Sequence, residues 1–225
     1  MIIGFVGFIG SGKDTAADYL VNFHGFRRES FANTLKDAVS NVFGWDRTLL
    51  EGRTKQAREW REQADEWWSN RLGKTITPRW VLQNWGTDVL RTHFHDDIWI
   101  ASLENKMRKT ADNIVISDVR FPNEITAIHN AGGIVVRVKR GDDPEWYKAA
   151  VSVNAGPVAN PTWSLSKSHL ERLVIHASET AWVGGDIDHT VFNNSSIDHL
   201  FDQLENLLEP DANLPEAVKI ALDLP

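Results

Sequence analysis

The stretch GFIGSGKDT, residues 7–15, constrains the fold of this chain more than any other feature. It follows a short apolar run, MIIGFV, and it precedes DTAADYLVNF, which has a helical pattern of apolar residues. A buried strand, a glycine-rich turn and a helix are the context in which G-x-x-x-x-G-K binds a polyphosphate through backbone N–H groups and a helix N-terminus. We therefore expect a phosphate-binding loop on a strand–helix unit.

The residues of this loop predict separate roles in binding a nucleotide. Gly10, Ser11 and Gly12 would present backbone N–H groups to the phosphates, and Lys13 would add a positive charge. Asp14 stands where Ser or Thr is expected, and we expect its carboxylate to ligate Mg²⁺ directly or through water, because hard cations prefer oxygen ligands. Thr15 would supply a hydroxyl to a phosphate or to the metal. The alternative is that Asp14 only favours the positive end of the helix.

The rest of the chain alternates apolar strand patterns with helical ones. The predicted strands cover residues 1–8, 26–32, 113–118, 134–140 and 189–193. Alternating strands and helices predict a parallel sheet that is covered on both faces, an α/β fold with three layers, α/β/α. Residues 141–175 are expected to be loop-like, because Pro144, Pro157 and Pro161 oppose long helices across them.

A second motif, NIVISDVRFPNE, places Asp118 at the carboxyl end of a predicted strand. Ligands of open α/β sheets bind at that edge, and an acid there commonly holds the Mg²⁺ shell of a nucleotide. Arg120 follows two residues later and could clamp a phosphate through paired N–H donors. The alternative is a salt bridge within a turn.

A third motif, TPRWVLQNWGTDVLR, combines side chains that recognise nucleotides. Gln83 could hydrogen-bond a base edge, Trp85 could stack on the base, and Arg79 and Arg91 could bind a monophosphate in bidentate fashion. Asp88 lies in the same segment. The alternative for Gln83 and Trp85 is ordinary helix surface and core.

Composition excludes several classes of protein. The formal net charge is −7, so no broad basic surface for duplex nucleic acid is expected. The chain has no cysteine, which excludes disulfides and thiolate metal sites and fits a reducing compartment. No stretch approaches the roughly 18 apolar residues that a membrane span needs, and no secretory leader is evident. We therefore expect a cytoplasmic protein that binds neither membranes nor duplex nucleic acid.

Taken together, the motifs resemble those of the bacteriophage-type deoxynucleoside monophosphate kinases, a branch of the P-loop nucleoside monophosphate kinases. The resemblance rests on GSGKDT, FANTLKDAV, REWREQADEWW, TPRWVLQNWGTDVLR, IWI, ISDVRFPNE, HASE and VFNNSSIDHLFDQL. It implies a nucleoside monophosphate kinase-like P-loop fold, with ATP and Mg²⁺ as cofactors and a deoxynucleoside monophosphate as acceptor. Asp followed by Thr after the P-loop lysine fits this family's pattern.

The resemblance also implies how the chain is organised. Residues 1–225 would form a single kinase domain, with the acceptor bound by residues 33–92 and a lid at 140–180. The catalytic set would be Lys13, Asp118, Arg120, Arg79 and Arg91. ATP would be bound by Gly10, Ser11, Gly12, Lys13, Asp14, Thr15 and Asn193, and the acceptor by Lys36, Arg79, Gln83, Trp85, Asp88 and Arg91. Metal ligands would be Asp14, Thr15 and Asp118, and the lid-end candidates would be His176 and Glu179.

Three alternatives stay open at this point. The same loop could serve a kinase of another small acceptor, such as dephospho-coenzyme A, or a nucleotide-dependent regulatory protein. A kinase of nucleic-acid ends is disfavoured by the acidic charge balance. The sequence leaves a homodimer open. If the chain is of phage origin, its location would be the host cytoplasm.

Overall fold

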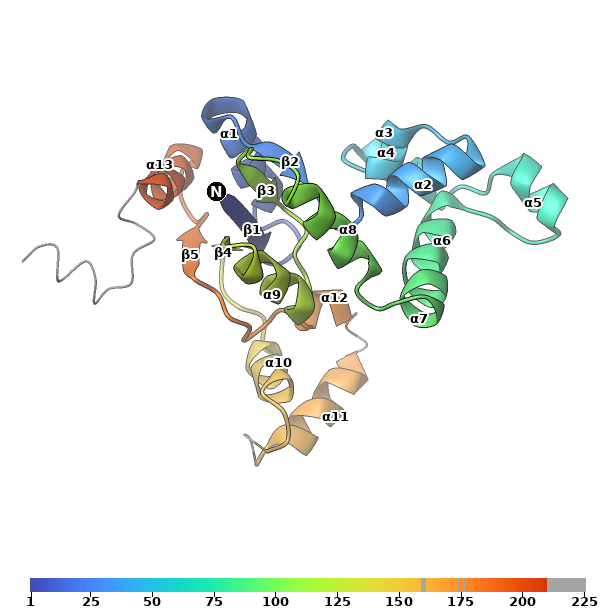
Figure 1. The fold of residues 1–225 in the computed structure, drawn as a ribbon. Helices are drawn as coiled ribbons and strands as arrows, with labels where there is room; N and C mark the ends of the chain where they lie inside the picture. The colour runs from blue at the N-terminus through green and yellow to red at the C-terminus, as the bar shows by residue number, and fades with distance from the viewer. Residues whose placement is uncertain (159–160, 174, 176, 210–225) are drawn as a thin grey trace, which may run out of the picture. The chain divides into compact units, whose positions relative to one another are not determined.

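The computed structural model describes residues 1–158, 161–173, 175 and 177–209, which include a five-stranded sheet (Figure 1). The strand order is β2-β3-β1-β4-β5. β1 pairs in parallel with β3 and with β4, and β4 pairs in parallel with β5. The strand bounds are β1 Ile2–Val6, β2 Arg27–Glu29, β3 Ile114–Ile116, β4 Ile134–Lys139 and β5 His189–Phe192.

Two compact units make up the described chain. The first comprises Met1–Arg28 and the described residues from Asp112 onward, and the second comprises Glu29–Ala111. The first unit carries most of the sheet and five helices: α1 Lys13–His24, α9 Pro122–Asn130, α10 Tyr147–Asn154, α11 Trp163–Leu173 and α13 Ile197–Leu208. A further short helix, α12, spans Ala177–Thr180.

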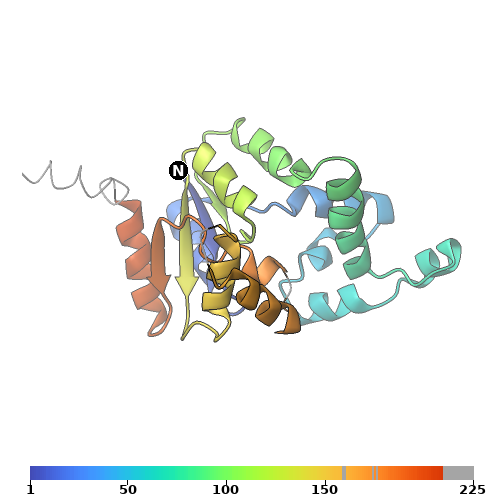
Figure 2. The ribbon, with the colours of Figure 1, turned by 90° about the horizontal axis from the view of Figure 1, so that it is seen from below.

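Helices cover both faces of the sheet in the first unit. Successive side chains of a strand point to opposite faces, so β1 shows what each face contacts. Ile3 and Phe5 join a buried cluster with α1 and α13, whereas a Cβ on Gly4 would meet Ile128 of α9 at 2.4 Å. Figure 2 shows α13 beside β5. The three-layer α/β/α fold with a parallel sheet is thereby confirmed.

The second unit is helical and lies in the sequence between β2 and β3. Its elements are α2 Asn33–Phe43, α3 Arg47–Glu51, α4 Lys55–Glu62, α5 Glu66–Leu72, α6 Pro78–Gln83, a π-helix η1 Asn84–Val89, α7 Leu90–His93 and α8 Ile98–Met107. Its tryptophans are largely structural. The Trp99 indole is buried and donates to the Gly86 carbonyl at 2.9 Å, and the Trp45 indole donates to Asp65 at 2.7 Å.

The segment 141–175 is not the loop that its prolines suggested, and this expectation was wrong. Helices α10 and α11 lie within it, and the prolines stand between and before them rather than inside them. Proline disfavours a helix interior but tolerates helix boundaries. Three prolines spaced this widely therefore delimit two short helices. Among the described residues, no helix has both the length and the apolar character needed to cross a membrane.

Candidate functional site

The loop between β1 and α1 has a backbone that only glycine adopts readily. Gly7, Gly10 and Gly12 have φ angles of 145°, 79° and 105°. A Cβ on Gly12 would meet the Asn193 side-chain nitrogen at 2.4 Å, whereas a Cβ on Gly10 would meet nothing within 4 Å. The Asn193 amide donates to the Ser11 carbonyl at 2.9 Å. Asn193, which directly follows β5, therefore braces the loop from one side and leaves the Gly10 side open.

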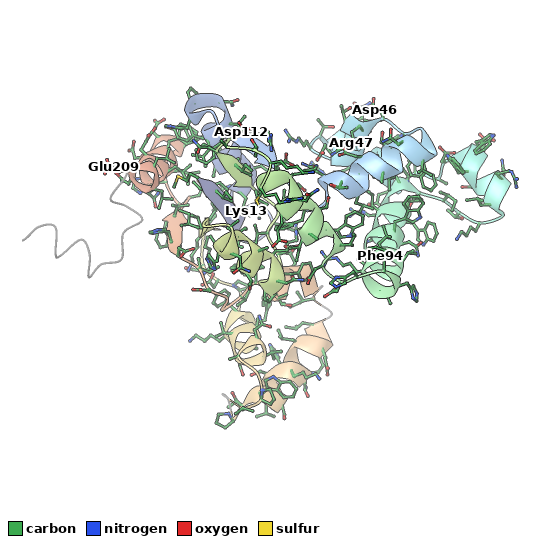
Figure 3. The ribbon with its side chains drawn as sticks, viewed as in Figure 1. Lys13, Asp46, Arg47, Phe94, Asp112 and Glu209 are labelled. Carbon is green, nitrogen blue, oxygen red and sulfur yellow. The ribbon has the colours of Figure 1, made fainter. Side chains whose placement is uncertain are left out.

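Lys13, which is labelled in Figure 3, begins α1, and its side chain reaches back to the loop that precedes it. Its ammonium donates to the carbonyls of Gly7 at 2.7 Å and Phe8 at 2.8 Å. Burial, and then the positive charge of Arg120, lower the pKa of Lys13 to about 8, against opposing contributions from Asp14 and Glu179. The Lys13 ammonium and the Arg120 guanidinium are therefore close enough to repel each other, and a bound anion would stabilise both charges.

Arg120 lies in the loop between β3 and α9 and contacts residues of two helices, α9 and α12. Its guanidinium donates to Glu179 of α12 at 2.8 Å. Its backbone N–H, together with that of Phe121, donates to the buried carboxylate of Glu124, at 2.8 and 3.2 Å. Lys13, Arg120 and Glu179 therefore lie together, whereas His176, the other lid-end candidate, lies outside the described residues.

Glu124 was not predicted as part of this region. It is the third residue of α9 and its carboxylate accepts from the N–H of the preceding residues, as in a capping box. The sequence signal was available, because FPNE places a proline at the first helical position and a glutamate two residues later. Glu124 fixes the backbone from which Arg120 extends.

Asp14 lies in the first turn of α1 beside an arginine that was also not predicted. The Arg28 guanidinium, from β2, pairs with Asp14 and donates to Asp18 at 2.6 Å and to the Ser117 hydroxyl at 2.6 Å. Ser117 directly follows β3 and precedes Asp118, which is half-buried. Asp14 and Asp118 therefore belong to neighbouring segments of the same unit.

The acceptor candidates lie in the second unit, and several already have partners there. Lys36 is largely buried and its ammonium lies 2.8 Å from a carboxylate oxygen of Glu51. Arg79 lies 2.7 Å from Glu62 with both side chains substantially exposed. Arg91 lies 4.0 Å from Asp96, a looser pair.

The remaining acceptor candidates differ in burial. Gln83 and Asp88 are exposed, and Asp88 accepts from Asn84 at 3.4 Å. Trp85 is half-buried, and its ring lies 5.4 Å from the Phe43 ring in an edge-to-face arrangement. The contact to Phe43 gives Trp85 a packing role in the second unit, whatever else it binds.

Comparisons with known proteins identify relatives of one kind. A family model described as deoxynucleotide monophosphate kinase matches residues 51–149. The chain is 34% identical to a predicted deoxynucleotide monophosphate kinase of Acanthamoeba polyphaga mimivirus, over 62% of this chain and 74% of that protein. It is 27% identical to the deoxynucleoside-5'-monophosphate kinase of Escherichia phage T5, over 55% of this chain and 70% of that protein.

Among solved structures, the chain is similar to a shikimate kinase of Aquifex aeolicus and a gluconokinase of Sinorhizobium meliloti. The first is 12% identical with a TM-score of 0.42, over 94% of this chain and 98% of that chain. The second is 14% identical with a TM-score of 0.33, over 91% of this chain and 94% of that chain. Likeness at this level carries no argument about activity.

Proposed function

The chain belongs to the deoxynucleotide monophosphate kinase family, and we propose that it moves the γ-phosphoryl group of ATP onto the phosphate of a deoxynucleoside monophosphate. An acceptor phosphate oxygen forms the new bond to phosphorus while the bond to the bridging oxygen of ATP breaks. The products are ADP and a deoxynucleoside diphosphate. The acceptor oxygen is already anionic, so the reaction needs positioning and charge neutralisation rather than a strong general base.

The observation that carries the proposal is the convergence of Lys13 and Arg120 beside a glycine-rich loop. The Lys13 ammonium is fixed by two loop carbonyls, and its pKa is lowered by burial and by the neighbouring guanidinium. Two neighbouring cations suit the negative charge of a triphosphate. The loop is also open beside Gly10, where an added Cβ would meet nothing within 4 Å, so a triphosphate could approach the backbone there. In the proposed reaction both cations neutralise charge on the transferred group.

The residues near this loop also suit Mg²⁺. Asp14 and Asp118 contribute carboxylate oxygens and Thr15 a hydroxyl, and Mg²⁺ is usually held by one or two carboxylates together with substrate phosphates. No group of three or more His, Cys, Asp or Glu side chains that could hold a metal occurs among the described residues. We propose that Asp14, Thr15 and Asp118 would hold the ion or its waters. When bound with the phosphates, Mg²⁺ supplies further neutralisation of their charge.

The second unit is proposed to bind the acceptor. Arg79 and Arg91 would hold its phosphate, and Gln83 and Trp85 would contact its base, with Lys36 and Asp88 as further acceptor-binding residues. The family match supports this proposal, because residues 51–149 include every one of these candidates except Lys36. The ATP-binding part of the site would be completed by Asn193 and by the segment 140–180, which includes Glu179.

A panel of acceptors tests the proposed activity. ATP consumption is measured by a coupled assay with each deoxynucleoside monophosphate, with the matching ribonucleotides, and with dephospho-coenzyme A. We expect consumption to rise at least about tenfold above the unstimulated rate with one or more deoxynucleotides, because an acceptor-dependent kinase must suppress hydrolysis of ATP by water. The proposal would be contradicted if only dephospho-coenzyme A raised ATP consumption, or if none of the tested acceptors raised it.

A further inference from the structure

Asp14 poses an electrostatic problem for a phosphate site. It directly follows Lys13, and 82% of its side chain is exposed. Its negative charge raises the pKa of Lys13, so the carboxylate lies within electrostatic reach of the ammonium that is proposed to face the phosphates. A bare carboxylate at that distance would repel a triphosphate, since like charges separated by less than a Debye length are only partly screened.

Arg28 lies where it can remove this problem. Its side chain is only 16% exposed, and it reaches Asp14 from the strand β2. Asp14 and Asp18 are four residues apart on α1 and therefore share one helix face. Arg28 pairs with both and also donates to the Ser117 hydroxyl at 2.6 Å. Three partners on two segments fix the direction of a planar guanidinium, which a lysine ammonium could not match in geometry.

We propose that Arg28 is a positioning residue that holds the Asp14 carboxylate in an ion pair, so that this acidic side chain in the first turn of the P-loop helix does not turn toward a bound nucleoside triphosphate. The inference rests on the proposed nucleotide binding. Arg28 need not touch the nucleotide, because its effect passes through Asp14. Because Coulomb interactions add pairwise, the direct attraction between the Arg28 charge and the phosphates does not depend on residue 14, whereas the positioning effect disappears when residue 14 carries no charge.

The adjacent residue provides a matched control. Arg27 lies on the same strand and its guanidinium is 2.9 Å from Asp112, with the two side chains 42% and 52% exposed (Figure 3 labels Asp112). Arg27→Gln removes the same charge from the same strand, at a position whose ion pair is with Asp112 rather than with Asp14. If net charge alone were responsible, Arg27→Gln and Arg28→Gln would weaken nucleotide binding equally.

The experiment is a double-mutant cycle on equilibrium binding of ATP, measured by titration calorimetry in EDTA, so that the proposed contact of Asp14 with Mg²⁺ does not contribute. Arg28→Gln is expected to weaken binding of metal-free ATP by about tenfold, as one uncompensated like charge would at partial screening. In the Asp14→Asn background the same substitution should change the affinity by less than about twofold. The tenfold loss should also shrink in about 1 M salt, where the Debye length is about 3 Å.

Three results would overturn the proposal: equal losses from Arg28→Gln in the parent chain and in the Asp14→Asn variant, equal losses from Arg27→Gln and Arg28→Gln, or a loss that salt does not change. If Arg28→Gln does not fold, Arg28→Lys is the second variant. A lysine loses the three-partner geometry but can keep the ion pair with Asp14, so this variant should bind metal-free ATP within about threefold of the parent chain. A tenfold loss would count against the proposal. Absence of ATP binding by the unmodified chain would instead refute the proposed function.

Discussion

At the scale of single residues, Lys13 is the clearest case of a side chain placed for charge rather than for packing. Its ammonium contacts two carbonyls of the loop itself, and its burial lowers its pKa to about 8. Lys13→Ala should therefore reduce phosphoryl transfer by about 10²–10³-fold, as expected when a single charge-stabilising donor is lost. Circular dichroism should show an unchanged fold. Near-normal turnover would contradict a phosphate role for this loop.

The lowered pKa of Lys13 also predicts a pH dependence. Below about pH 8 the ammonium is already charged, and phosphates bind without proton uptake. A bound polyanion favours the charged form, so the pKa of Lys13 is higher in the complex, and binding above pH 8 takes up a proton. ATP affinity should therefore fall by up to about tenfold per pH unit above 8. Calorimetry in buffers of different ionisation enthalpy measures this uptake, and no proton uptake above about pH 8 would contradict the assignment.

A substitution of Glu179 tests whether this pH dependence comes from Lys13. Its carboxylate raises the pKa of Lys13 and pairs with Arg120 at 2.8 Å. Glu179→Gln should lower the pKa of Lys13 further, so that proton uptake on ATP binding begins at a lower pH than in the parent chain. Glu171→Gln, which changes an exposed glutamate of α11, serves as the control and should leave the onset unchanged. A shift toward higher pH in Glu179→Gln would contradict this arrangement of charges.

At the scale of elements, strand and helix patterns predicted most of the fold. The strand–loop–helix at residues 2–24 formed as expected, because apolar periodicity and the glycine-rich turn are local signals. The loop expected at 141–175 was wrong, because prolines mark boundaries and leave room for α10 and α11 between them. Within residues 78–94, Gly86 lies in a π-helical turn. A Cβ added there would meet Leu35 at 2.8 Å, so this turn packs closely against α2.

The parts of the site that were not predicted depend on contacts between distant segments. Arg28 reaches Asp14 across neighbouring elements, and Arg120 reaches Glu179 across 59 positions of sequence. The charge and spacing of residues within one segment do not indicate which side chains of a distant segment they will pair with. The loop residues and Asp118 could be proposed from the sequence because they lie at the carboxyl ends of predicted strands.

The second unit is stabilised through its buried tryptophans, and this predicts an asymmetric response to substitution. Trp99 is 7% exposed and its indole bonds to the Gly86 carbonyl at 2.9 Å, linking α8 to the π-helix. Trp99→Phe would leave that buried carbonyl without its donor and should lower the free energy of unfolding by about 1–3 kcal/mol. Trp67, 63% exposed, is the control, and Trp67→Phe should change it by less than about 0.5 kcal/mol. Urea unfolding measures both, and equal effects would contradict the structural role of Trp99.

At the scale of the whole molecule, the residues proposed to bind ATP and those proposed to bind the acceptor lie in different units. The first carries the glycine-rich loop, Lys13 and Arg120, and the second carries the arginines and aromatic residues proposed for the acceptor. The family match spans parts of both units, since residues 51–149 cross the boundary at 111–112. Sequence alone predicted the chemistry of each part from its residue types, but not the division into two units.

Transfer of label from ATP tests the central claim most directly. The chain is incubated with γ-³²P-labelled ATP and a deoxynucleoside monophosphate, and the products are separated by chromatography. We predict that the label appears in the β-phosphate of the deoxynucleoside diphosphate, in equal amount to the ADP formed, and that the Lys13→Ala variant forms labelled product at least about 100-fold more slowly. Label released only as inorganic phosphate, or transferred at the same rate by Lys13→Ala, would contradict the account.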